Sequence, residues 1–162
     1  MAMKGRAMSP PPHPPHTGEL VRAGPYQVLA GGGADLLPDD LTRADVLVPL
    51  AGFAHFGLGR RYDVIGCPWR DYAGPPPGWQ EFLKEIILPE LEAGRRLLVF
   101  CHAGHGRTGT FLASLIALLE SPDETPYPVL ATRERYCERA VETEAQLMAV
   151  AALPRPNGRD AV

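Results

Sequence analysis

The fold of this chain is indicated most clearly by residues 96–109, which read Arg96-Leu97-Leu98-Val99-Phe100-Cys101-His102-Ala103-Gly104-His105-Gly106-Arg107-Thr108-Gly109. Its nearly unbroken apolar start, residues 96–100, is typical of a buried parallel strand. The glycines that follow predict a tight loop, and a helix is expected from about residue 108 to residue 119. A strand, a glycine-rich loop and a helix in this order direct several backbone N–H groups and the positive end of the helix dipole to one point. The stretch therefore predicts an anion-binding cradle.

The elements on either side of this stretch alternate between strands and helices. Further strands are expected at 26–30, 46–50 and 62–66. A short helical turn is expected at 39–43, a helix kinked or broken by Pro89 at 79–93, and a helical stretch split near Arg139 at 129–152. This alternation predicts an α/β fold with a central, mostly parallel sheet of four to five strands flanked by helices.

Composition indicates one soluble domain in a reducing compartment. The 162 residues suit one core, and the net charge of −3 gives no overall attraction to nucleic acid. No apolar run approaches the roughly 20 residues that span a bilayer. Three cysteines far apart, without a Cys-x-x-Cys pair, favour neither a disulfide framework nor structural zinc. We expect a cytoplasmic protein with a disordered Pro-rich tail at 1–18, one folded domain at 19–153 and a flexible tail at 154–162.

Cys101 lies at the base of the predicted cradle, where the same donors would stabilise its thiolate, the nucleophilic form of the side chain. Arg107 follows six residues later and can grip two phosphate oxygens with its planar guanidinium. Thr108 can donate a hydrogen bond to the sulfur. A nucleotide-binding P-loop would need a lysine that this stretch lacks. The phosphate-binding positions are predicted to be His102, Ala103, Gly104, His105, Gly106 and Arg107.

Cys101-x5-Arg107-Thr108 resembles the signature loop of the protein tyrosine phosphatase superfamily, in particular its dual-specificity branch. Residues 101–109 are also similar to the loop of the tumour-suppressor phosphoinositide phosphatase, which has lysines at the positions of His102 and His105. This chain departs from the family at Phe100, where family members usually have a histidine. The resemblance implies a dual-specificity-phosphatase-like fold and hydrolysis of phosphomonoesters through a phosphocysteine, without a cofactor or a metal ion.

A thiolate that attacks a phosphate ester needs an acid to protonate the departing oxygen. The segment from Trp69 to Pro76 resembles the Trp-Pro-Asp loop of the family and lies about 30 residues before Cys101, which makes Asp71 the predicted general acid. Asp63 is the competitor, but it falls inside a predicted strand. Gln146 lies in a segment that resembles one with which some family members position the hydrolytic water; a solvated helix residue is the equal alternative.

The sequence leaves the substrate open. A protein tyrosine or dual-specificity phosphatase is the first hypothesis, and a phosphoinositide or inositol-phosphate phosphatase is the alternative, so the partner is a phosphorylated protein or a polyanionic small-molecule phosphate. His102 and His105 either face a bound substrate or are variable loop positions. A non-catalytic phosphate-binding module is disfavoured by the full residue set, and a sulfur-transfer or arsenate-reducing enzyme is disfavoured by Asp71. Cys67 and Cys137 are packing residues or disulfide partners for an oxidised Cys101.

Overall fold

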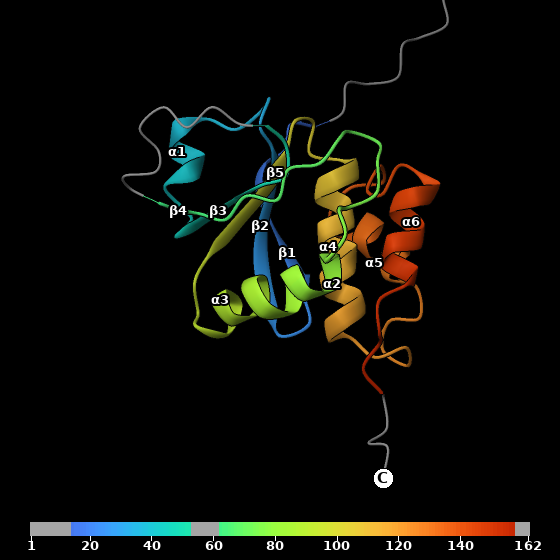
Figure 1. Ribbon diagram of the computed structural model, residues 1–162. Helices are drawn as coiled ribbons and strands as arrows, with labels where there is room; N and C mark the ends of the chain where they lie inside the picture. The colour runs from blue at the N-terminus through green and yellow to red at the C-terminus, as the bar shows by residue number, and fades with distance from the viewer. Residues whose placement is uncertain (1–13, 53–61, 158–162) are drawn as a thin grey trace, which may run out of the picture.

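Five strands form the central sheet of the computed structural model, which describes residues 14–52 and 62–157 (Figure 1). They are β1 (Thr17–Ala23), β2 (Tyr26–Gly32), β3 (Val46–Pro49), β4 (Asp63–Val64) and β5 (Leu97–Cys101). Their order across the sheet is β1-β2-β5-β3-β4, with β1 antiparallel to β2 and every other pairing parallel. The predicted mostly parallel α/β sheet is confirmed.

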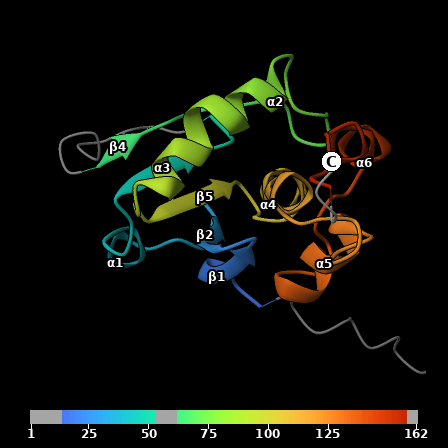
Figure 2. The same cartoon turned by 90° about the horizontal axis from the view of Figure 1, so that it is seen from below.

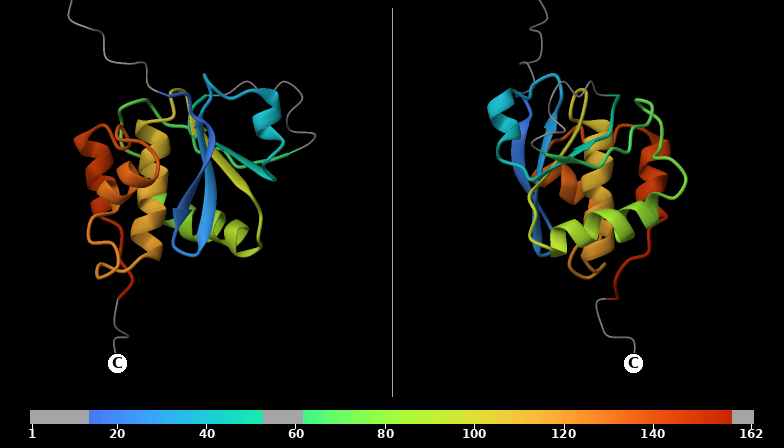
Figure 3. Two further views of the ribbon diagram at one scale, coloured as in Figure 1. Left: turned by 180° about the vertical axis from the view of Figure 1, so that it is seen from behind. Right: turned by 60° about the vertical axis from the view of Figure 1, so that its left-hand side comes forward.

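Helices cover the two faces of the sheet unequally (Figure 2). One face carries only the short α1 (Pro38–Leu41) among the described residues. The other face is covered by two groups of helical elements. The first group is α2 (Trp79–Phe82), the π-helical turn η2 (Leu83–Ile87) and α3 (Leu88–Glu92), and the second is α4 (Gly106–Leu119), α5 (Pro128–Arg135) and α6 (Glu144–Ala151). Helix α4 lies between the sheet and the pair α5 and α6 (Figure 3).

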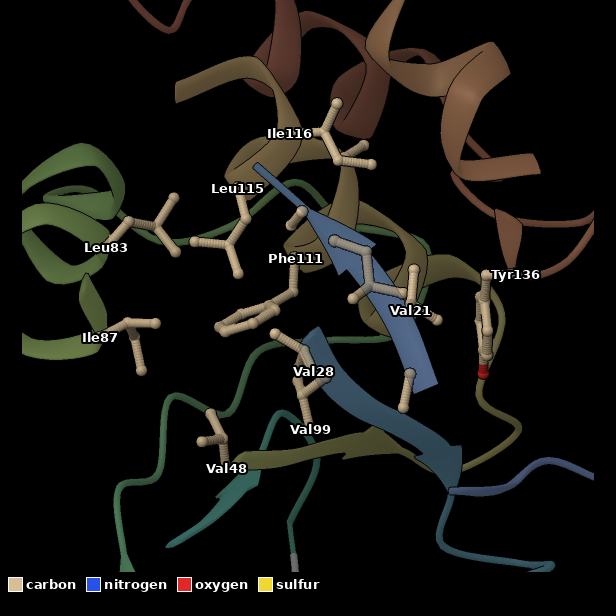
Figure 4. Close-up of a cluster of buried hydrophobic side chains, with 14 of the residues drawn as sticks. Val21, Val28, Val48, Leu83, Ile87, Val99, Phe111, Leu115, Ile116 and Tyr136 are labelled. Atoms are coloured by element: carbon tan, nitrogen blue, oxygen red, sulfur yellow. The ribbon is translucent and has the colours of Figure 1, made fainter. Parts of the chain in front are cut away.

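The side chains of β5 alternate between two hydrophobic clusters, as a strand buried on both faces requires. Leu97, Val99 and Cys101 belong to the large cluster, and Leu98 and Phe100 belong to the small one beside α1. In the large cluster, Phe111 of α4 lies among sheet valines and the side chains of η2 (Figure 4). Phe100 is 3% exposed and packs in the smaller cluster.

Pro89 is expected from the sequence to kink or break the helix at 79–93. The structure instead continues the helix and widens it into the π-helical turn Leu83–Ile87 directly before α3. Proline lacks the N–H that would close an α-helical turn and its ring clashes with the carbonyl four residues earlier, and a wider turn relieves both problems. The expected split of the last helical stretch is confirmed, because residues 136–143 separate α5 from α6.

Both ends of the folded part extend further than the sequence predicts. Strand β1 begins at Thr17, inside the expected tail 1–18, and the buried His16 donates its backbone N–H to Asp35 at 3.0 Å and accepts from the N–H of Gly32 at 3.1 Å. Arg155, inside the expected tail 154–162, donates to the backbone carbonyls of residues 117, 120 and 125. The rest of these tails, residues 1–13 and 158–162, lies outside the described residues. Among those described, no helix is long and apolar enough to cross a membrane.

Candidate active site

The loop between β5 and α4 passes very close to the end of β2. A Cβ atom added to Gly32 would lie 2.6 Å from the carbonyl carbon and oxygen of Ala103, and one added to Gly104 would lie 2.8 Å from the backbone nitrogen of Gly32. Gly104 also has a φ of +84°, in the left-handed region that favours glycine. The end of β2 therefore forms the wall against which the loop folds, and both glycines are required by this contact.

Cys101 is the last residue of β5, and its buried sulfur faces into the loop. Sγ accepts hydrogen bonds from the backbone N–H of Gly104 and from the hydroxyl of Thr108, each at 3.2 Å. The same hydroxyl oxygen accepts from the N–H of Cys101 at 2.9 Å, and the carbonyl of Gly31, 3.2 Å away, is its alternative acceptor. The sulfur thus has two donors, as the sequence predicts for Thr108 and for the loop amides.

Arg107 extends from the first turn of α4 and is 6% exposed. One terminal nitrogen, Nη1, donates to the carbonyl of Trp69 at 2.9 Å. Its Nε makes no hydrogen bond to any described residue, although it is buried. Buried donors are almost always paired in folded proteins, so this N–H is a donor that a bound anion could accept from.

The segment around Asp71 lies against the loop and α4, as predicted (Figure 1). Oδ1 of Asp71 is 3.6 Å from Nε of Arg107, and the Asp71 side chain is 54% exposed. The next residue, Tyr72, has a φ of +64° and is also exposed. The competitor Asp63 lies in β4 and pairs with Arg95. Of the two aspartates, only Asp71 is placed beside the predicted phosphate-binding loop.

Gln146 is completely buried, so the alternative of a solvated helix residue is wrong. Its Nε2 donates to the carbonyl of Ala73 at 3.2 Å, and its Oε1 accepts from the N–H of Glu142 at 2.9 Å. The side chain therefore ties the Asp71 segment to the chain between α5 and α6. The sequence assigned no role to Glu142, which lies in the same segment. Desolvation, and then the negative charge of Asp71, raise the pKa of its carboxyl group, which also receives a hydrogen bond from the backbone of Gly106.

The two loop histidines have different surroundings. His102 is exposed. His105 instead packs its ring against buried residues, edge-to-face on His16 with ring centroids 4.9 Å apart, and its Nδ1 lies 3.5 Å from Sγ of Cys137. The expectation of a substrate-facing side chain thus fits His102 better than His105. Cys67 is half-buried, and desolvation raises the pKa of its thiol.

No family model matches the sequence. Two uncharacterized proteins of Methanocaldococcus jannaschii are similar to part of it. One is 39% identical over 83 residues, which are 51% of this chain and 54% of the relative. The other is 36% identical over 86 residues, which are 53% of this chain and 52% of the relative. The matched region therefore spans about half the length of these curated relatives.

Solved structures share the fold over most of the chain. A mutant form of Tk-PTP has 18% identity and a TM-score of 0.65, covering 83% of this chain and 92% of that one. Human DUSP28 has 17% identity and a TM-score of 0.59, covering 86% and 92%. PTPMT1 in complex with PI(5)P has 15% identity and a TM-score of 0.56, covering 76% and 86%. The resemblance to tyrosine and dual-specificity phosphatases is thus confirmed for the fold.

Proposed function

We propose that the protein is a cysteine-dependent phosphomonoester hydrolase of the tyrosine or dual-specificity type. One observation carries the proposal: the sulfur of Cys101 has two hydrogen-bond donors while Arg107 and Asp71 lie beside each other over the same loop. This reaction needs three groups: a thiolate nucleophile, a cationic group that binds the phosphoryl oxygens, and a carboxyl group that transfers protons. The shared fold of tyrosine and dual-specificity phosphatases supports the assignment.

In the first proposed step, the thiolate of Cys101 attacks phosphorus and forms a P–S bond. The bond from phosphorus to the leaving oxygen breaks, and Asp71 in its acid form gives that oxygen a proton. The N–H groups of the loop and the guanidinium of Arg107 hold the three remaining phosphoryl oxygens as their negative charge redistributes. The buried Nε of Arg107, beside Asp71, is one of these donors.

In the second proposed step, water attacks the phosphorus of the phosphocysteine, and Asp71 accepts a proton from that water. The P–S bond breaks, and the sulfur leaves as a thiolate and accepts hydrogen bonds from Gly104 N–H and the Thr108 hydroxyl. Inorganic phosphate is released and Asp71 is again the acid. No step requires a cofactor. We assign Gln146 to holding the Asp71 segment through Ala73 rather than to direct contact with the water.

We favour a phosphorylated protein as the substrate. Asp71 and Tyr72 are both exposed, which suits an open site that a protein side chain can enter. A polyanionic lipid headgroup would be matched best by two basic side chains that face the substrate. The ring of His105 packs against His16 instead, so His102 is the exposed histidine of the loop. The phosphoinositide alternative is kept because PTPMT1, whose fold is shared, was solved with PI(5)P.

Hydrolysis of an aryl phosphate tests the proposal directly. The wild-type chain and Cys67→Ser should hydrolyse it at equal rates, and Cys101→Ser should lose all activity above background. Cys67→Ser is the matched control because it removes a half-buried thiol outside the loop. Equal activity of the wild type and Cys101→Ser would reject a Cys101-based mechanism. Binding of phosphate without hydrolysis by the wild type would instead indicate a non-catalytic module.

A substrate panel then separates the two substrate classes. Phosphotyrosine peptides and phosphoinositide vesicles are compared at equal phosphate concentration, and we expect kcat/KM to be higher for the peptides. His102→Ala should have little effect on peptide hydrolysis. A preference for the vesicles that His102→Ala abolishes would favour the lipid substrate.

A further inference from the structure

A cluster of possible metal ligands includes His105 of the phosphate-binding loop, and none of its side chains takes part in the proposed reaction. His16, His105 and Cys137 each offer one ligand atom, and these atoms all lie within 4.8 Å of one another. They come from three separate places: the residue before β1, the residue before α4 and the segment between α5 and α6. No sequence spacing predicts such a site, because the fold alone brings the three residues together.

One distance within the cluster matches a tetrahedral zinc site. Zinc binds sulfur at about 2.3 Å and histidine nitrogen at about 2.0–2.1 Å, so in a tetrahedral site a sulfur and a nitrogen lie about 3.5 Å apart. Sγ of Cys137 and Nδ1 of His105 are 3.5 Å apart. The ring of His16 stands edge-to-face on that of His105 and also packs on Tyr136 at a centroid distance of 4.7 Å. The Cys137–His105 pair forms a hydrogen bond in the structure, and its length is also the spacing that tetrahedral zinc imposes on two of its ligands.

Glu19 orients His16 in the manner of a supporting carboxylate. Nδ1 of His16 donates to Oε1 of Glu19 at 2.6 Å, and since a carboxylate only accepts, Nδ1 carries the hydrogen and Nε2 carries the lone pair. Histidines that bind metal ions almost always donate their other N–H to a carboxylate or carbonyl in this way. His16 and Cys137 are 2% and 4% exposed, so water would have restricted access to the one coordination position that the three residues leave open.

We propose that His16, His105 and Cys137 bind one Zn²⁺ ion, with Glu19 as the supporting carboxylate of His16. Two imidazoles and a thiolate form a ligand set that binds zinc in preference to magnesium or calcium, which favour oxygen ligands. The ion would link the start of β1, the phosphate-binding loop and the segment after α5. Tyr136, the neighbour of Cys137, already contacts the same loop through a hydrogen bond from its hydroxyl to the carbonyl of Gly104. The proposal stands independently of phosphatase activity.

Metal binding by the full-length chain tests the site. After metal removal with a chelator, Zn²⁺ is titrated to determine stoichiometry, and Co²⁺ is used because thiolate coordination gives a charge-transfer absorption band. We expect one equivalent of Zn²⁺, a thiolate band with Co²⁺ and a higher melting temperature with Zn²⁺. Cys137→Ser should lose the band, and Glu19→Gln should weaken Zn²⁺ binding about 10–100-fold, as loss of a supporting partner does.

Two control variants separate this site from other thiols. Cys67→Ser and Cys101→Ser should keep the band and the affinity. Loss of the band in Cys101→Ser, or its persistence in Cys137→Ser, would overturn the proposal, as would the absence of tight Zn²⁺ binding by the wild type. Glu19 is partly exposed, so Glu19→Gln is expected to fold even where Cys137→Ser does not. Unchanged Zn²⁺ affinity in Glu19→Gln would also contradict the proposed geometry.

Discussion

Oδ1 of Asp71 lies 3.6 Å from Nε of Arg107, so the proposed general acid lies directly beside the guanidinium that is proposed to bind the phosphate. The Asp71 side chain is 54% exposed and that of Arg107 is 7% exposed. A bound phosphate would therefore meet a buried guanidinium and a solvent-exposed carboxyl group. Arg107 is in addition anchored to the Asp71 segment through the carbonyl of Trp69 at 2.9 Å.

Asp71→Asn should reduce kcat on a phosphate ester with a poor leaving group by about 10²–10⁴-fold, the usual contribution of a general acid. The loss should be much smaller with a good leaving group, which departs without a proton. Steady-state kinetics with the two types of ester measure both effects. Asp63→Asn is the matched control and should retain activity, because Asp63 lies in β4 and pairs with Arg95. A loss below about tenfold on the poor leaving group would remove Asp71 as the acid.

Gln146→Ala should lower both stability and kcat, with a smaller effect on KM. The variant leaves the N–H of Glu142 and the carbonyl of Ala73 without their partner, and each such loss in a buried setting costs about 1–3 kcal/mol. The Asp71 segment would then be held less firmly. Denaturant unfolding and steady-state kinetics check the two effects. Gln27→Ala, at an exposed position of β2, should change neither quantity. A stable Gln146→Ala variant with unaltered kcat would contradict the positioning role.

Gly32→Ala should displace the phosphate-binding loop, although residue 32 is far from Cys101 in the sequence. The added Cβ would lie 2.6 Å from the backbone of Ala103, and overpacking of this kind typically costs about 1–3 kcal/mol. A shift of about 1 Å in the loop would lower activity about 10²-fold. Gly66→Ala is the control, since its Cβ would have no neighbour nearer than 3.7 Å among the described residues. Thermal melts and aryl phosphate hydrolysis measure the difference, and equal behaviour of the two variants would refute the contact.

Glu120 should make the free energy of unfolding depend on pH in the acid range. Burial raises the pKa of this carboxyl group, but hydrogen bonds from Arg135, Thr125 and the backbone of Gly24, together with the charge of Arg135, outweigh it and lower the pKa to about 2. The group is 3% exposed, so the shift from 4.5 corresponds to about 3 kcal/mol. Since the folded-state pKa is the lower one, this stability is present above about pH 4.5 and is lost as the pH falls toward 2.

Urea unfolding between about pH 6 and pH 3 checks this dependence. Glu120→Gln should be less stable than the wild type at the higher pH and should lose part of the acid dependence. Glu85→Gln, at an exposed position, should match the wild type throughout. Identical pH profiles for Glu120→Gln and the wild type would show that the pair with Arg135 contributes nothing to stability.

Local signals explain what the sequence could predict. The apolar run of β5 and the glycines after it are contiguous, so the strand, the loop and α4 follow from neighbouring residues. The observed bounds are shifted slightly: β5 is Leu97–Cys101 instead of 96–100, and α4 begins at Gly106 instead of Thr108. Asp71 could be placed because its segment has a distinctive sequence. In contrast, β1 is an edge strand in which buried Val21 and Ala23 alternate with exposed Leu20 and Arg22, and this pattern is too short and too weak to predict a strand.

Long-range contacts explain what the sequence could not predict. The burial of Gln146 depends on two backbone groups from different segments, and a helix pattern alone makes a solvated position equally plausible. A substrate-facing side chain is a reasonable expectation for His105, because nothing near it in the sequence indicates that His16 and Cys137 are its neighbours. Only the three-dimensional path of the chain reveals these contacts.

The π-helical turn before Pro89 also determines which side chains the helix presents to the sheet. Trp79, Leu83, Ile87 and Leu91 are all buried and are spaced four residues apart, whereas Ile86, one residue before Ile87, is 46% exposed. In a regular α-helix, positions spaced four apart drift by about 40° at each step, or about 120° over these three steps. A turn that holds more residues reduces this drift. Deletion of one residue from the turn would therefore rotate Leu91 relative to Trp79 and turn one end of the buried stripe away from the core.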